Sequence, residues 1–61
     1  MSQVYNPEAE LMEDIERLAR EARDIRQRVE WARTPQDKKV LNRQLQEIEE
    51  QITALQSRLP H

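Results

Sequence analysis

The sequence predicts an all-α protein, an antiparallel helical hairpin whose two helices form a coiled coil. Three observations support this fold class. Two segments carry apolar residues at alternating spacings of four and three, each segment is preceded by a capping residue and a proline, and glycine is absent from all 61 residues. The spacing is the heptad pattern of a coiled coil, and the lack of glycine raises intrinsic helicity. We expect one domain over residues 1–61, with helices at about 7–33 and 35–59 and a turn at 33–35.

Each predicted helix has a recognisable start. Asn6 followed by Pro7 is typical of an N-cap and a first helical position, where the missing proline N–H costs nothing. Thr34 and Pro35 repeat this arrangement, and Asp37 stands where a capping box normally has Glu or Gln. The two pairs therefore predict two helix starts.

Prolines also predict the helix ends. A proline disfavours the α conformation in the residue before it, so the first helix must stop by about Arg33, ahead of Pro35. By the same rule, Pro60 ends the second helix at about Leu59.

The apolar residues form one narrow stripe on each helix, as in a coiled-coil seam. The predicted seam consists of Leu11, Ile15, Leu18, Ala22, Ile25, Val29 and Ala32 in the first helix, and of Leu41, Leu45, Ile48, Ile52, Leu55 and Leu59 in the second. Continuing the first heptad past the central proline would put polar residues on the seam, so a single kinked helix is excluded.

The two seams mirror one another about Pro35, and this symmetry predicts the antiparallel register. Leu11 is matched with Leu59, and the later pairs follow in order, each joining an a position to a d position. The same register places Asp14 opposite Arg58, so we expect a salt bridge between them.

Composition limits the classes of function. Ten Lys and Arg stand against twelve Asp and Glu, and this net charge of -2 gives no bulk attraction to nucleic acid or anionic lipid. No apolar run is long enough for a membrane span or a signal peptide, so we expect no membrane association and a cytoplasmic location.

The residues that enzymes and metal sites need are also scarce. Cysteine is absent, the one histidine is His61, and glycine is not available for an oxyanion loop or a phosphate cradle. The predicted seams hold no carboxylate for a di-metal bundle. We therefore expect no enzymatic activity, no cofactor and no metal.

Charge is unevenly distributed along the hairpin. Residues 26–43, at the turn end, carry a net charge of +4, whereas residues 1–25 carry -4 and residues 44–61 carry -2. Two hairpins side by side in opposite directions place each basic end against an acidic one. Because a two-helix hairpin leaves its seam partly wet, we expect an antiparallel homodimer that forms a four-helix bundle.

Four apolar residues outside the seam are candidates for a partner interface. Met12 and Ala19 widen the stripe of the first helix on one flank, while Trp31 and Val40 lie beside the turn. Trp31 either covers the turn of its own hairpin or anchors a partner, a role in which tryptophan is enriched. These residues favour a non-enzymatic protein–protein interaction module, a small adaptor or regulator with a protein partner.

The alternative is a small nucleic-acid-binding regulator that uses the basic turn end. Its candidate contact residues are Arg26, Arg33, Lys38, Lys39 and Arg43. The outline of a short self-pairing hairpin resembles the repressor-of-primer proteins over the whole chain, in shape and not through a shared motif. That resemblance implies an antiparallel four-helix bundle that binds paired RNA loops. The shape also suits subunits of larger assemblies.

Overall fold

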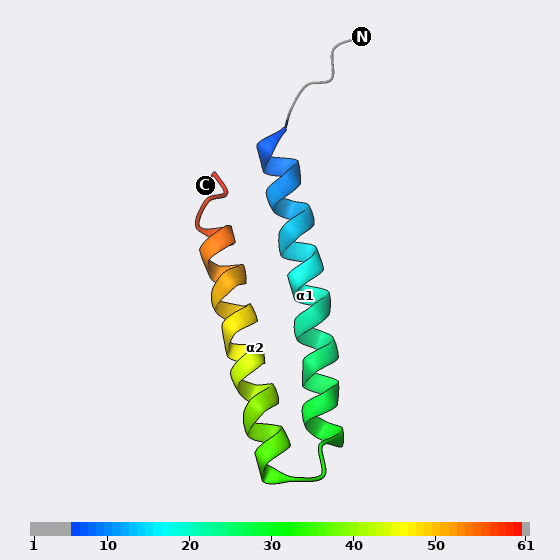
Figure 1. Ribbon diagram of the computed structural model, residues 1–61. Helices are drawn as coiled ribbons and strands as arrows, with labels where there is room; N and C mark the ends of the chain where they lie inside the picture. The colour runs from blue at the N-terminus through cyan, green and yellow to red at the C-terminus, as the bar shows by residue number, and fades with distance from the viewer. Residues whose placement is uncertain (1–5, 61) are drawn as a thin grey trace.

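The computed structural model describes residues 6–60 and is a helical hairpin without strands over that range. Helix α1 spans Pro7–Trp31 and helix α2 spans Pro35–Gln56. The two helices run side by side in opposite directions, joined by a short connection at one end (Figure 1). The predicted all-α antiparallel hairpin is confirmed.

Helix α1 begins at the predicted cap. The backbone of Asn6 is extended, with φ of -119° and ψ of 94°, and its side chain accepts hydrogen bonds from the backbone N–H groups of Glu8 and Ala9 at 3.1 and 3.2 Å. These bonds satisfy two of the donors that the first helical turn leaves without a partner.

The connection between the helices covers residues 32–34 and begins one residue before the turn predicted at 33–35. Helix α1 ends at Trp31 rather than at about Arg33, and Ala32 is already extended, with φ of -65° and ψ of 131°. Packed helix axes lie about 8–10 Å apart and an extended residue spans about 3.3 Å, so the crossing needs several non-helical residues. Thr34, also extended, completes the crossing and caps α2 by accepting a hydrogen bond from the N–H of Asp37 at 3.1 Å.

Helix α2 ends at Gln56 rather than at about Leu59. Beyond it the backbone tightens, because the N–H of Arg58 donates to Leu55 and that of Leu59 to Gln56, three residues back in each case. A tightened final turn is a common way to satisfy helix-end carbonyls, and Pro60 disfavours the α conformation at Leu59. Leu59 nevertheless stays half-buried, as a seam residue should.

The core of the hairpin is the predicted seam, but α1 buries its share more deeply than α2. Leu18, Ala22 and Ile25 are 8%, 2% and 8% exposed, and no residue of α2 is buried. Every other predicted seam residue is half-buried; within residues 6–60 that class otherwise contains only Asp14 and Ala19. The heptad assignment is therefore confirmed, and the seam of α2 remains partly open to solvent.

One predicted ion pair is replaced by others. Asp14 pairs with Arg17 on its own helix at 3.3 Å, not with Arg58 across the seam. An exposed pair gains little free energy, so a partner on the same helix, three residues away, competes effectively with one on the facing helix. The ion pair that does join the helices connects Arg26 with Glu49.

Candidate interaction surface

The seam has two flanks on opposite sides of the hairpin, set by the heptad positions next to the core. We call one the bridged flank. It consists of Met12, Ala19, Arg26, Asn42, Glu49 and Gln56. We call the other the open flank. It consists of Asp14, Glu21, Arg28, Asp37, Gln44, Gln51 and Arg58.

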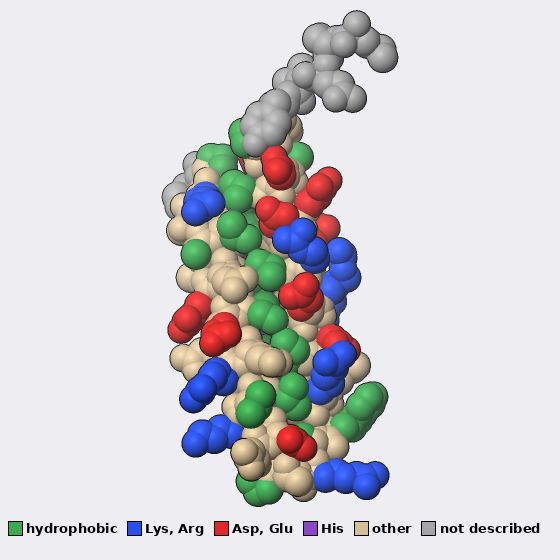
Figure 2. All heavy atoms as spheres, in the orientation of Figure 1, with side chains coloured by type: hydrophobic (Ala, Val, Ile, Leu, Met, Phe, Trp, Pro, Cys, Tyr) green, Lys and Arg blue, Asp and Glu red, His purple; other side chains and the backbone are tan. Residues whose placement is uncertain are grey.

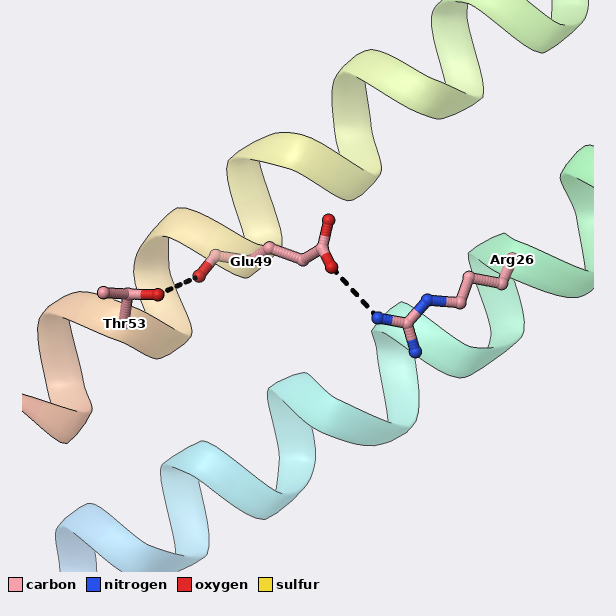
Figure 3. Close-up of polar contacts among 3 residues, drawn as sticks. All are labelled: Arg26, Glu49 and Thr53. Carbon is pink, nitrogen blue, oxygen red and sulfur yellow. Dashed lines mark hydrogen bonds and ion pairs between the residues drawn. The ribbon is translucent and has the colours of Figure 1, made fainter.

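One contact between the helices crosses the bridged flank. The guanidinium Nη2 of Arg26 donates to Oε2 of Glu49 at 3.0 Å, and the two side chains span the seam (Figure 3). The hydroxyl of Thr53 donates to the backbone carbonyl of Glu49 at 3.0 Å and so ties the next turn to the same residue. Both charged side chains are about half exposed, so this bridge is a surface ion pair.

Met12 and Ala19 lie on the bridged flank, one heptad apart. Met12 is 46% exposed and Ala19 is half-buried. The structure thus places these two predicted interface residues together, on the α1 side of the flank that Arg26 and Glu49 cross.

The open flank has a shallow depression at each end. The depression at the turn end is lined by Arg28, Trp31, Ala32, Asp37, Val40 and Leu41. The depression at the other end is lined by Pro7, Glu10, Leu11, Asp14, Leu55 and Arg58. Between the helices on this face, a hydrophobic stripe follows the seam, bordered by charged side chains (Figure 2). The open flank therefore combines apolar surface with charges at both ends.

Trp31 and Val40 lie together at the turn-end depression. Trp31 is 74% exposed and Val40 is 52% exposed. Most of the indole is in solvent, so it is not packed down as a cover for its own turn. These two predicted interface residues lie on the open flank, on the opposite side of the seam from Met12 and Ala19.

The five predicted nucleic-acid residues are all exposed, and one of them is paired with an acidic residue. Arg26 is engaged on the bridged flank with Glu49. The remaining four are exposed residues of the connection and of the first turns of α2, namely Arg33, Lys38, Lys39 and Arg43. The three of these in α2 border a shallow depression that Asn42 of the bridged flank also lines.

The charged residues of the open flank are not predicted as a group from the sequence. Asp14, Arg28, Asp37 and Arg58 line the two depressions there, but the sequence predicts only a salt bridge between Asp14 and Arg58 and a capping position for Asp37. The available signal is positional, because all four occupy the same heptad position beside the seam.

Metal-ligand clusters and membrane-spanning helices are both absent from the part of the chain that the structure describes. Over residues 6–60 no three His, Cys, Asp or Glu side chains gather closely enough to hold a metal ion. Neither α1 nor α2 is both long and apolar enough to cross a membrane. What the surface offers is an incompletely covered apolar seam.

No model of a known protein family, no characterised protein and no solved structure matches the chain.

Proposed function

We propose that this chain is a non-enzymatic protein–protein interaction module, a helical hairpin that associates with a second copy of itself in antiparallel orientation to form a four-helix bundle. As an adaptor or small regulator, the bundle presents its remaining surface to a larger protein. The observation that carries the proposal is the half-exposed seam of α2, none of whose residues is buried. Apolar area removed from water contributes about 25 cal/mol per Å², so covering that seam is favourable.

Charge supports the antiparallel orientation. The turn end, residues 26–43, carries +4, and the remaining segments carry -4 and -2. Antiparallel hairpins bring opposite charges together at both ends, whereas parallel hairpins bring like charges together.

The oligomeric state tests the proposal directly. Sedimentation equilibrium over a dilution series in the micromolar range is expected to give twice the 7.4 kDa chain mass at high concentration, with dissociation on dilution. A folded 7.4 kDa monomer at every concentration would overturn the proposal.

A second candidate function is nucleic-acid binding by the exposed cations at the start of α2. Lys39 and Arg43 together line two surface depressions there, which favours this alternative. Binding through phosphate contacts weakens steeply as salt rises. A gel-shift titration at several salt concentrations separates the two functions, because absence of binding, or binding indifferent to salt, eliminates the nucleic-acid alternative.

A further inference from the structure

We propose that the second copy packs on the open flank, with a two-fold axis passing close to Glu21, so that Trp31 and Val40 of each copy cover Leu11 and Leu55 of the other. This inference rests on the proposed self-association and adds the interface to it. It selects the open flank over the bridged flank, and it assigns Trp31 the role of an interface anchor.

The contacts within the single hairpin favour the open flank as the interface. On the bridged flank, the ion pair between Arg26 and Glu49 spans the seam at 3.0 Å, so a partner must break or desolvate it to reach the apolar residues beneath. On the open flank, the apolar stripe is exposed between the helices (Figure 2), and the described residues form no ion pair across it. A partner reaches the seam there without that cost.

The charged residues of α1 on the open flank match those of a second copy that runs in the opposite direction. Asp14, Glu21 and Arg28 follow one another at intervals of one heptad. An antiparallel two-fold axis at Glu21 therefore places Asp14 of each copy opposite Arg28 of the other. Such an interface uses the same patch on both subunits, as a closed dimer requires.

An axis at nearly the same height also matches the open flank of α2. Its residues at this heptad position are Asp37, Gln44, Gln51 and Arg58, in that order. Reversal about their midpoint places Asp37 opposite Arg58, and Gln44 opposite Gln51. Opposite charges thus meet at both ends of this helix, with neutral amides between them.

The bridged flank gives no such match. Reversal of its α1 residues about Ala19 places Met12 opposite Arg26, and reversal of its α2 residues places Asn42 opposite Gln56. Glu49 then faces itself, as Glu21 does on the open flank, but here no pair of opposite charges offsets the repulsion. In these antiparallel registers, opposite charges of the two copies meet on the open flank alone.

Apolar contacts follow from the same registers. The axis at Glu21 brings Trp31 level with Leu11 of the second copy, and the α2 midpoint brings Val40 level with Leu55. Leu11 and Leu55 are half-buried and line the depression at the open end of the hairpin. The most exposed apolar side chains at one end thereby cover the incompletely buried ones at the other, twice per dimer.

Ion pairs within each hairpin do not prevent this arrangement. Arg28 pairs with Asp24 at 3.1 Å and Asp14 with Arg17 at 3.3 Å, and all four side chains are partly exposed. Surface pairs of this kind contribute about 0–1 kcal/mol, so exchanging or sharing partners costs little. The guanidinium of Arg28 has five N–H donors and can bind two carboxylates.

Disulfide cross-linking tests the position of the axis, because the chain contains no cysteine. In the proposed dimer, residue 21 of one copy lies next to residue 21 of the other. The Glu21→Cys variant is therefore expected to form a disulfide-linked dimer under mild oxidation. Ala19→Cys is the matched control, at nearly the same height on the bridged flank, and is expected to stay reduced. Non-reducing electrophoresis and intact mass report both.

The possible results distinguish this inference from the proposed function. If Ala19→Cys cross-links in place of Glu21→Cys, or if neither does although the mass is dimeric, the open-flank interface is wrong and self-association stands. A monomeric mass at all concentrations overturns both.

Affinity gives a second, independent readout. Trp31→Ala is expected to weaken dimerisation by at least about 30-fold, the loss typical of one buried tryptophan hot spot, because both copies lose the contact. Met12→Ala, on the bridged flank, is expected to change it less than about threefold, as for a residue outside the interface. Trp31 is the only tryptophan, so its emission should also shift to shorter wavelength as the wild-type concentration rises. Equal effects of the two substitutions, or emission independent of concentration, would refute the interface.

Discussion

At the scale of single residues, the side chain of Thr34 fixes the point where the connection becomes α2. Its hydroxyl accepts a hydrogen bond from the N–H of Asp37 at 3.1 Å. Thr34→Ala removes that acceptor and is expected to lower the free energy of unfolding by about 1 kcal/mol. Urea unfolding followed by circular dichroism at a fixed protein concentration measures the change.

Thr53→Ala is the control for that substitution. Thr53 is exposed within α2, and its hydroxyl donates to the backbone carbonyl of Glu49. The exchange leaves no helix-end donor without a partner and introduces a better helix former, so stability should stay equal or rise by a few tenths of a kcal/mol. If Thr34→Ala lowers the free energy of unfolding no more than Thr53→Ala does, the capping role of Thr34 is contradicted.

Arg26 and Glu49 form the residue pair that connects the helices directly. Their side chains are 54% and 50% exposed, so solvent screens the attraction. A double-mutant cycle with Arg26→Ala and Glu49→Ala is expected to give a coupling free energy of about 0.2–1 kcal/mol, which decreases as salt is added. A coupling free energy of zero at low salt would show that this ion pair does not stabilise the packing of α1 against α2.

At the scale of the helices, close packing is concentrated around Ala22. It is the most buried residue of the hairpin, at 2% exposed, and lies in α1 between Leu18 and Ile25. Ala22→Leu adds volume where the facing helix leaves no room and is expected to cost about 1–3 kcal/mol of stability. Ala9→Leu, an exposed position in the first turns of α1, serves as control and should change stability little. Thermal unfolding of both variants is the measurement, and equal melting temperatures would contradict tight packing at Ala22.

Periodicity and capping were enough to predict both helix starts and the whole seam. Seam residues as far apart as Leu11 and Leu59 are buried or half-buried as the heptad requires. The helix ends were placed too late, because proline limits where a helix can continue but not how many residues the chain needs to cross to its neighbour. Trp31 and Gln56 are therefore ends that the packing distance and the last backbone hydrogen bonds decide.

The candidate surface was predictable only in part. Trp31 and Val40 stand out in the sequence as apolar residues off the seam, and the structure brings them together. The pairing of Asp14 was not predictable, since several exposed charges within reach differ by only fractions of a kcal/mol. Which flank is bridged depends on that same competition, so it emerges from the three-dimensional contacts of Arg26 and not from composition.

At the scale of the whole molecule, one hairpin is half of the proposed interaction unit. Its stability and its association are then linked, because a second copy that binds the folded hairpin stabilises it by mass action. The melting temperature should accordingly rise with protein concentration, and the rise should be smaller for Trp31→Ala than for the wild type. Differential scanning calorimetry over a hundredfold concentration range measures this, and a melting temperature independent of concentration would contradict the link.

The proposed axis also has a weak point that predicts how the dimer can be strengthened. It places Glu21 of one copy next to Glu21 of the other, and neighbouring like charges oppose association. Glu21→Gln should therefore tighten dimerisation about two- to fivefold, by analogy with other surface charge pairs, and the gain should shrink with added salt. Glu13→Gln makes the same change in net charge on the outer, exposed face of α1 and serves as the matched control. The dissociation constants of the two variants, measured by sedimentation at low and high salt, decide the matter: a gain shared equally by both reflects net charge alone and would move the axis away from Glu21.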